Sequence, residues 1–465
     1  MRSWRALKWR ILSLRDGHPD FAAYRALLRN ERMTPAELAD LRRRKARLLV
    51  RECLDNVPYF GDLMRAHHIT PERVDGPETL EALPLLTRPI IRAQRARMLN
   101  RTADPTAFFP HTTGGSSGTP LDFYRGRDYD RLANAAANMR AWRRMGWRPG
   151  DTMARFWLSH DDLAKPAGML GAVRRALRRW LQPPELTFQA HDTSPAVMAL
   201  WVDQLRSFRP AFLYGYGSML TLFANYLHQH RISIPGVRGI ASTAEALLPR
   251  ARALLREAFP GAVVIDIYGS REIPGIASDC AHGTMHVNAD LVHVEYLPDA
   301  GIPGRQRLIL TALDNTLFPF IRYDIGDQGS PGERDCPCDL PFPTMTWGIG
   351  RVIDSFITPE GRIIHPSFFE DLMYGIPGIH QYQFLQTSER EIVLSIVPDA
   401  GFDESTRARL QNLQAAVMRG FSPRTRLEWK LVEAIPKTPS GKHLYLVSRV
   451  RNPVLPTRAD PDASS

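Results

Sequence analysis

Helical and strand-like patterns divide the chain into successive regions. Residues 41–54, LRRRKARLLVRECL, combine Arg, Ala and Leu, which favour helices, and Pro58, Pro71 and Pro84 interrupt this helical region. From residue 110 to 340, short apolar runs such as VVIDIYG and RLILTAL alternate with helical patterns such as PAVMALWVDQLRSF. The alternation predicts an α/β sheet domain that follows a largely helical start.

The pattern changes near residue 350. A turn-rich passage there leads into ITPEGRII, which is typical of a hairpin, and then into a helical pattern. IVLSIV and RLEWKLV further on are typical of strands, and the end of the chain is rich in Pro, Asp, Ala and Ser. We therefore predict an α/β fold with a large N-terminal domain of several subdomains over 1–349, helical over most of 1–100. A small mobile α+β domain over 350–452 and a loose tail over 453–465 follow.

The positive charge of the chain is concentrated near its N-terminus. The net charge is +11, and residues 1–60 hold 14 Lys and Arg against seven Asp and Glu. The opening segment places four apolar side chains near one helical face with arginines around them, namely Trp4, Leu7, Ile11 and Leu14. This predicts either a helix packed on its own domain or a helix in peripheral contact with a membrane. No recognition motif for nucleic acid accompanies the charge.

The sequence also indicates where the protein resides. Arginines interrupt the opening segment too often for a secretory signal, and no apolar run is long enough to span a membrane. Four cysteines in 465 residues are too few for a disulfide scaffold. We therefore expect a cytoplasmic protein.

HTTGGSSGTP, residues 111–120, combines three glycines with five hydroxyl residues. A Walker-type phosphate loop needs a lysine directly after its last glycine, whereas Thr119 stands there. The segment spells the G-x-S-x-G of a hydrolase nucleophile elbow, but an elbow needs a helix after it, and the strand-like PLDFYR follows. Two interpretations remain: a plain glycine-rich turn, or a loop whose N–H groups and hydroxyls wrap the phosphates of a nucleotide.

Four further motifs follow the glycine loop. DIYGSRE, 266–272, is an apolar strand that ends in an aromatic residue and an acid, which suit a base and a metal ion. RYDIGD, 322–327, ends in an acid that can bind both hydroxyls of a ribose. GRVID at 350–354 comes next, and PKTPSGK at 436–442 places a lysine on a turn framed by Pro and Gly.

In this order the motifs resemble the adenylate-forming superfamily of acyl-CoA synthetases, luciferases and nonribosomal adenylation domains. The resemblance covers nearly the whole chain. Upstream, NVPYF at 56–60 and LPLLTR at 83–88 resemble the phenylacetate-CoA ligase and CapK-type branch. The resemblance implies an ATP- and Mg²⁺-dependent ligase that converts a small-molecule carboxylic acid into an acyl-adenylate. In most relatives the acyl group then passes to coenzyme A.

The resemblance also implies a set of nucleotide-binding residues. These are Thr113, Gly114, Gly115, Ser116, Ser117, Gly118, Thr119, Thr243, Ala244, Glu245, Asp266, Tyr268, Gly269, Ser270, Asp327 and Arg351. In the family the glycine loop binds the β- and γ-phosphates, the residues of STAEA and DIY lie at the adenine, and Asp327 binds the ribose. The family often carries a lysine where this chain has Thr119.

Three further residues are implied in catalysis and domain movement. Glu272 helps to hold Mg²⁺ on the phosphates while pyrophosphate leaves. Lys442 enters the site and bridges the acyl carboxylate and the α-phosphate, where a flexible ammonium group suits a part that moves in and out. Asp354 is the hinge about which the C-terminal domain turns.

Three thiols and two imidazoles predict a metal site, because they suffice for a four-coordinate zinc ion. The five residues are Cys280, His282, His286, Cys336 and Cys338. The spacing resembles that of members of the phenylacetate-CoA ligase branch that bind structural zinc. That resemblance implies all of them except His282 as ligands. The other interpretation is three reduced thiols in loops.

The sequence does not identify the acid. Aromatic residues near the expected pocket fit an aryl or apolar acid, and equally an ordinary core: Phe156, Trp157, Tyr214 and Tyr216. One alternative function is a ligase that transfers the acyl group to an amine or hydroxyl in surface-polysaccharide or natural-product biosynthesis. Another is a basic surface-binding protein that keeps this fold without catalysis, although Glu272, Asp327 and Lys442 argue against it.

Overall fold

The computed structural model describes most of the chain. The described residues are 11, 19–112, 121–157, 185–189, 195–298, 306–333, 336–347, 356–364, 366–373, 376–398, 401–436 and 445–450. Five predicted features lie outside them: most of the basic opening segment, the glycine loop from Thr113 to Thr119, Arg351, Asp354 and Lys442.

The N-terminal region is built of helices. They are α2 (Pro19–Asn30), α3 (Pro35–Asn56), α4 (Pro58–Ala66) and α5 (Arg88–Met98), with short 3-10 turns at Pro71–Arg73, Pro77–Ala82 and Pro105–Ala107. Thr34 caps α3 by accepting a hydrogen bond from the Glu37 N–H, and the Glu37 side chain accepts from the Thr34 N–H in return. Prolines in the first turn of α3, α4 and α5 favour helix starts at these points. No helix among the described residues is long and apolar enough to cross a membrane.

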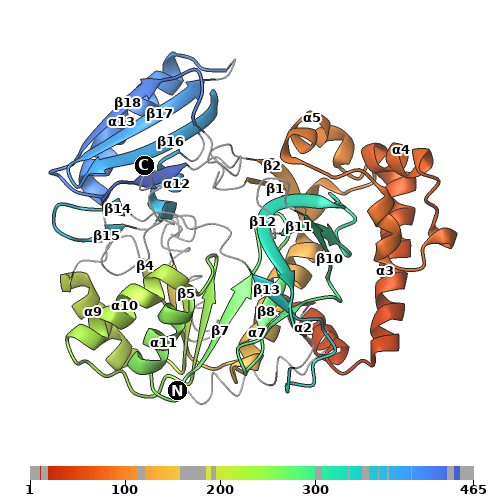
Figure 1. Cartoon of the computed structure of the whole chain (residues 1–465), viewed down its shortest axis with the longest axis horizontal. Helices are drawn as coiled ribbons and strands as arrows, with labels where there is room; N and C mark the ends of the chain where they lie inside the picture. The colour runs from red at the N-terminus through yellow and green to blue at the C-terminus, as the bar shows by residue number, and fades with distance from the viewer. Residues whose placement is uncertain are drawn as a thin grey trace, which may run out of the picture.

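A seven-stranded sheet forms the centre of the N-terminal part (Figure 1). Its order is β4 (Glu185–Gln189), β3 (Met153–Trp157), β5 (Phe212–Tyr216), β6 (Gly239–Thr243), β7 (Val263–Tyr268), β8 (Ala277–Asp279) and β9 (Met285–Val287). The first five strands are parallel, and β8 and β9 are antiparallel. The predicted α/β sheet domain is therefore present.

Helices cover both faces of this sheet. The helices α9 (Pro195–Phe208), α10 (Gly217–Gln229) and α11 (Pro249–Ala258) pack through one apolar cluster that includes Phe156 and Phe223. A second cluster, with Trp142 and Ile265, packs α7 (Ala137–Arg144) on the sheet. The segment before α7 comprises α6 (Arg127–Tyr129) and the π-helix η4 (Asp130–Ala136).

Two antiparallel structures flank the parallel sheet. The first is a four-stranded sheet of β10 (Val292–Pro298), β11 (Gln306–Ala312), β12 (Tyr323–Pro331) and β13 (Met345–Trp347). The expectation that RLILTAL belongs to the α/β sheet is wrong, because it forms β11, which pairs antiparallel with β10 and β12. The second is the hairpin of β1 (Phe108–Thr112) and β2 (Asp122–Gly126), which brackets the glycine loop.

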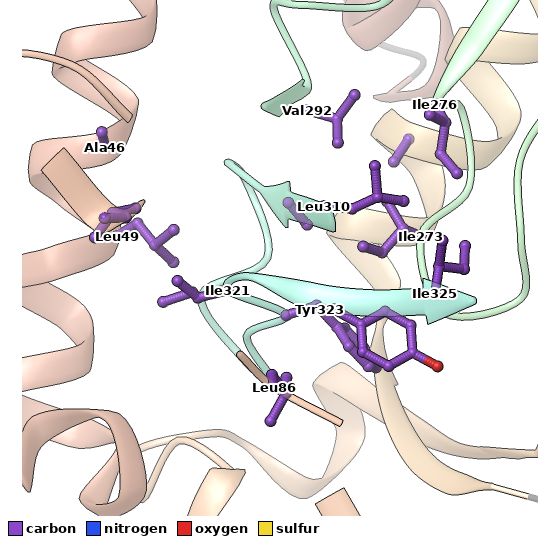
Figure 2. Close-up of a cluster of buried hydrophobic side chains, with 14 of the residues drawn as sticks. Ala46, Leu49, Leu86, Ile273, Ile276, Val292, Leu310, Ile321, Tyr323 and Ile325 are labelled. Carbon is purple, nitrogen blue, oxygen red and sulfur yellow. The ribbon is translucent and has the colours of Figure 1, made fainter. Parts of the chain in front are cut away.

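The largest apolar cluster joins the N-terminal helices to the antiparallel sheet. It contains Leu49 of α3, Leu86 before α5, and Tyr323 of β12. Figure 2 shows side chains from these segments converging, with Leu86 beside the strand that carries Tyr323. The helical start and the sheets are therefore parts of one folded unit.

The C-terminal region has its own core. It comprises β14 (Phe356–Ile357), β15 (Ile363–Ile364), α12 (Pro366–Met373), β16 (Ile379–Ser388), β17 (Glu391–Pro398), α13 (Glu404–Gly420), β18 (Arg426–Leu431) and β19 (Leu446–Ser448). The sheet order is β18-β17-β16-β19, and α12 and α13 pack with this sheet in one apolar cluster. ITPEGRII forms the predicted hairpin, and IVLSIV and RLEWKL form strands. The region is a small α+β unit at one end of the molecule (Figure 1).

A buried ion pair ties the N-terminal helices to the core. Arg140 of α7 donates to both carboxylate oxygens of Asp290, at 2.7 and 3.0 Å, and both side chains are at most 1% exposed. The Asp290 carboxylate also accepts from Asn30 of α2, and its backbone carbonyl accepts from Lys45 of α3. Burial raises the pKa of Asp290, but Arg140 and Lys45 outweigh it and hold the pKa below its usual value.

Replacing Asp290 by alanine should destabilise the protein by about 3–5 kcal/mol, because it leaves the Arg140 guanidinium buried without its carboxylate. Thermal unfolding followed by circular dichroism checks this. Arg131→Ala is the matched control, since it removes a half-exposed pair with Asp20 and should cost less than about 1 kcal/mol. Equal melting temperatures for the two variants would contradict the assigned role of the buried pair.

Candidate functional site

The predicted nucleotide motifs meet at one edge of the parallel sheet. β6 and β7 are neighbours, so Thr243 and Tyr268, the last residues of each, lie at the same carboxyl edge. In open α/β sheets, ligands bind outside the carboxyl ends of the strands. In Figure 1 the arrowheads of β5 and β7 point to the side on which the C-terminal unit lies. The STAEA and GSRE segments leave the sheet at this edge.

A hydrogen bond joins the residues predicted for adenine and ribose. The Tyr268 hydroxyl donates to Asp327 Oδ2 at 2.9 Å. Both side chains are buried, and they come from different sheets, since Tyr268 ends β7 and Asp327 lies on β12. Two motifs separated by 59 residues along the chain are thus brought together.

Asp266 fixes the turn that carries Thr243, Ala244 and Glu245. Its carboxylate accepts from the Leu247 N–H at 3.0 Å and from the Ile267 N–H at 3.1 Å. Ala244 has a φ of 68°, a left-handed conformation that such a tight turn requires. Burial raises the pKa of Asp266 to about 7, against the lowering effect of the Leu247 N–H. In this structure Asp266 therefore orients the turn, and its predicted contact with adenine stays a prediction.

The turn after β7 positions Glu272. The Ser270 N–H donates to the Ile273 carbonyl at 2.9 Å, and the Ile273 N–H donates to Ser270 Oγ at 3.0 Å. A side chain on Gly269 would come within 3.0 Å of the Gly275 nitrogen, so glycine permits the close approach of this turn. Gly269 and Ser270 therefore shape the loop that delivers Glu272.

Glu272 is a buried carboxylate held by two partners. The Tyr323 hydroxyl donates to Glu272 Oε1 at 2.8 Å, and Arg88 Nη2 lies 3.4 Å from the same oxygen. Arg88 Nε also donates to the Tyr323 hydroxyl at 3.2 Å. The Glu272 side chain is only 4% exposed. A carboxylate in this setting can take part in binding a hard cation such as Mg²⁺.

Sequence reasoning did not single out Arg88 and Tyr323. Arg88 lies 184 residues before Glu272, and Tyr323 lies 51 residues after it, so no local pattern connects them. Both residues belong to motifs that the sequence shows, Arg88 to LPLLTR and Tyr323 to RYDIGD. In RYDIGD, however, the sequence pattern assigned a role only to the acid, Asp327.

The base of the glycine loop contacts the same turn. Thr112, the last described residue before the loop, accepts through its carbonyl from Arg271 Nη1 at 3.2 Å. His111 stacks on Phe123 of β2, with ring centroids 5.3 Å apart. Burial and the charges of Arg125 and Arg271 together lower the pKa of His111 to about 4, so this imidazole is neutral at neutral pH. Arg125 of β2 also donates to the Arg271 carbonyl, so the strands on both sides of the loop adjoin the Glu272 turn.

The predicted metal ligands form one cluster. The ligand atoms of Cys280, His286, Cys336 and Cys338 all lie within 4.8 Å of one another. The sulfurs of Cys280 and Cys336 are 3.6 Å apart, close to the roughly 3.8 Å that two thiolates on one tetrahedral zinc require. His282 is exposed and lies outside this group.

The surroundings of the cluster suit a metal ion. His286 Nδ1 lies 2.9 Å from the Phe342 carbonyl, to which it can donate, while Nε2 faces Cys338 Sγ at 3.2 Å. This arrangement fixes the ring with Nε2 available as a ligand. Burial opposes ionisation of Cys336, but hydrogen bonds from Thr284 and His286 lower its pKa to about 6. The four residues fit zinc, and they would join the β8–β9 hairpin to the loop after β12.

The aromatic residues expected near the acid pocket fall into two groups. Phe156 is fully buried against Phe188 and Trp201, which favours the interpretation of this residue as ordinary core. Tyr214 is also buried. Trp157 and Tyr216 are partly exposed at the carboxyl ends of β3 and β5, with ring centroids 5.1 Å apart. Tyr216 ends β5, which is next to β6, and Trp157 ends β3, one strand further from β6.

Comparison with known proteins bears on this arrangement. Residues 356–449 match the CapK C-terminal domain family. Protein CapK of Staphylococcus aureus is 21% identical over 404 residues, which cover 85% of this chain and 86% of that protein. A 2-hydroxyisobutyryl-CoA ligase in complex with 2-HIB-AMP and CoA in the thioesterification state is similar in fold, with a TM-score of 0.59 and 21% identity over 90% of this chain and 92% of that one. For the same ligase in the postadenylation state with 2-HIB-AMP, the TM-score is 0.55 and the sequence identity is 22%, over 90% of each chain.

The fold of this chain is thus that of a solved acyl-CoA ligase, and the likeness extends over both the large part and the small C-terminal unit. The C-terminal unit itself carries the CapK-type domain, and similarity to a CapK protein runs through most of the chain. The family match is confined to residues 356–449, and the comparison with the solved ligase establishes the fold of the chain.

Proposed function

We propose that this protein is an ATP-dependent carboxylic acid ligase. In the first step a carboxylate oxygen attacks the α-phosphorus of ATP, the bond from that phosphorus to the oxygen shared with the β-phosphate breaks, and pyrophosphate leaves. The observation that carries the proposal is the meeting of Tyr268, Asp327 and Glu272 at the carboxyl edge of the parallel sheet. These contacts support a site in which Asp327 would bind the ribose and Glu272 would bind a metal ion.

Each residue has a separate role in this proposal. Asp327, held by Tyr268, accepts from the ribose hydroxyls, and the Thr243 turn lines the adenine. Glu272 holds Mg²⁺, which would neutralise part of the phosphate charge as pyrophosphate leaves. The glycine loop from Thr113 to Thr119 binds the β- and γ-phosphates. Lys442 reaches the α-phosphate from the C-terminal domain, with Arg351 and Asp354 at the linker.

Coenzyme A is the proposed acceptor. Its thiolate would attack the acyl carbonyl, and the bond to AMP would break with AMP as the leaving group. The similar 2-hydroxyisobutyryl-CoA ligase is described with both an adenylate and CoA, which supports this choice. Trp157 and Tyr216, at strand ends beside the nucleotide edge, support an aryl or apolar acid.

We propose a structural zinc ion as a separate component. Cys280, His286, Cys336 and Cys338 would hold it, with closed four-fold coordination that leaves no position for substrate. The ion would fasten the edge of the seven-stranded sheet to the loop before β13. It takes no part in the chemical steps.

Exchange of labelled pyrophosphate into ATP, measured with a panel of carboxylic acids, tests the ligase proposal. With an acid that the protein accepts, Lys442→Ala and Glu272→Gln should each lower the exchange rate by about a hundredfold, because each removes charge stabilisation at the phosphates. Lys430→Ala is the control, since Lys430 is an exposed lysine on β18 of the same domain. Exchange that is equally fast in all three variants would rule out the assigned roles, and wild-type silence across a broad panel would sink the ligase proposal.

The acceptor is tested by the rate of AMP release from acid and ATP. We expect coenzyme A to accelerate this release about tenfold or more over water, because the thiol removes the bound adenylate. Hydroxylamine serves as the comparison, since it traps any adenylate without a dedicated acceptor site. If an amine or hydroxyl acceptor accelerates AMP release and coenzyme A does not, the protein is instead a ligase that transfers the acyl group to an amine or hydroxyl.

Metal analysis by mass spectrometry tests the zinc site. The purified protein should contain about one equivalent of zinc. Cys336→Ser should lose the metal and unfold at lower temperature, because the ion would link the β8–β9 hairpin to the loop after β12. His282→Ala should keep both metal and stability, since this exposed histidine lies outside the cluster. Zinc well below one equivalent, with an unchanged Cys336→Ser variant, would remove the site.

A further inference from the structure

A short N-terminal segment is paired directly with the strand that begins the ribose motif. The Leu86 N–H donates to the Arg322 carbonyl, and the Asp324 N–H donates to the Leu86 carbonyl, both at 2.9 Å. Leu86 and Tyr323 thus form a parallel bridge, and Leu86 is buried in the largest apolar cluster (Figure 2). Because α5 begins two residues later, this pairing fixes the first residue of α5, Arg88, beside Tyr323.

Arg88 is a buried cation in the proposed phosphate region. Its guanidinium contacts Glu272 at 3.4 Å and Tyr323 at 3.2 Å, and its side chain is 15% exposed. Burial opposes its charge, but Tyr323, Glu272 and Asp327 raise its pKa above the usual value. Arg88 is therefore charged, and it contacts Glu272, the carboxylate that we propose as a ligand of Mg²⁺.

Arg92 extends this charge along α5, which packs beside the β1–β2 hairpin, where the Arg95 guanidinium lies 4.6 Å from the ring centroid of Tyr124 on β2. It lies one helical turn after Arg88, so both side chains leave the same side of α5. Burial and the neighbouring Arg88 lower the pKa of Arg92, and Tyr323 and Asp122 oppose this effect. Asp122 pairs with Thr112 at the base of the β1–β2 hairpin, the point from which the glycine loop leaves. Arg92 is exposed, on the same side of α5 as Arg88.

The glycine loop itself carries no cation. Residues 112–120 contain no Lys or Arg, and Thr119 follows the last glycine. A triphosphate bears several negative charges, of which one Mg²⁺ neutralises only a part, and phosphate sites commonly add Lys or Arg for the remainder. Arg271 already contacts the Thr112 carbonyl at the base of the hairpin, and Arg88 and Arg92 of α5 offer further positive charge.

We propose that Arg88 and Arg92 bind the β- and γ-phosphates of ATP and supply from α5 the positive charge that the glycine loop lacks. This rests on the proposed function. With Mg·ATP bound, Glu272 would hold the metal ion, and Arg88 would contact phosphate oxygens in place of this carboxylate. Tyr323 keeps its hydrogen bond to Glu272 and holds the carboxylate in place during the exchange. Arg88 and Arg92 then stabilise pyrophosphate as it leaves.

Binding measurements separate this role from a purely structural one. Isothermal titration of the full-length protein with Mg·ATP, with magnesium pyrophosphate and with AMP requires no knowledge of the acid. Arg88→Ala and Arg92→Gln should each weaken binding of ATP and of pyrophosphate by about ten- to a hundredfold, the effect of removing a hydrogen-bonded charge. AMP lacks the β- and γ-phosphates, so its affinity should stay within about twofold. Arg88→Lys should recover part of the ATP affinity, because it keeps the charge and loses only the forked geometry.

Arg97→Ala is the matched control on the same helix. Arg97 is exposed and pairs with Asp62 of α4, so this variant should bind all three ligands like the wild type. If Arg88→Ala does not fold, Arg88→Lys and Arg92→Gln carry the test. Unchanged ATP affinity in Arg92→Gln and Arg88→Lys, or an equal loss of ATP and AMP affinity, would overturn the inference. A wild-type protein that binds no ATP would instead remove the proposed function on which it rests.

Discussion

The arrangement of the site depends on one buried carboxylate. Glu272 is 4% exposed, and an unpaired carboxylate at such a depth would cost several kcal/mol. The Tyr323 hydroxyl and the Arg88 guanidinium provide the compensation. These three residues belong to the turn after β7, to the antiparallel sheet and to the N-terminal helices. Satisfying one carboxylate therefore requires three substructures to dock together, which makes the helical start an integral part of the site.

A second set of contacts links the nucleotide edge to the cysteine cluster. Asp279 Oδ2 accepts from the Asp266 N–H at 2.9 Å and from Arg252 at 2.6 Å, and Cys280 is the next residue along the chain. Any restraint on Cys280 thus acts on β8 and, through Asp279, on β7. Asp266 in turn holds the turn of Thr243 to Glu245. The cluster lies away from the reacting groups, yet it is connected to the adenine side through two hydrogen-bonded carboxylates.

The sequence could predict features whose determinants are local. DIYGSRE shows a strand, a turn and an acid within seven residues, and ITPEGRII shows a hairpin, because apolar alternation and turn residues are short-range signals. The four residues that the resemblance implies as metal ligands do lie together in the structure, although they come from two separate segments of the chain. The separate antiparallel sheet was missed, since β11 has the same apolar pattern as a parallel strand. Arg88 was missed because its role depends on the pairing of Leu86 with β12, a contact across more than 230 residues that periodicity cannot show.

The position of a cation on α5 has a physical consequence for the proposed site. A lysine within a glycine loop moves with that loop, whereas Arg88 is fixed by the backbone pairing of Leu86 and by the start of a helix. Fixed charges need little reorganisation as negative charge develops, which favours catalysis. The opposing cost is that Arg88 must leave Glu272 first. That contact is long, at 3.4 Å, while the 2.8 Å bond from Tyr323 can persist, so the carboxylate keeps a partner throughout and the exchange avoids an unpaired buried charge.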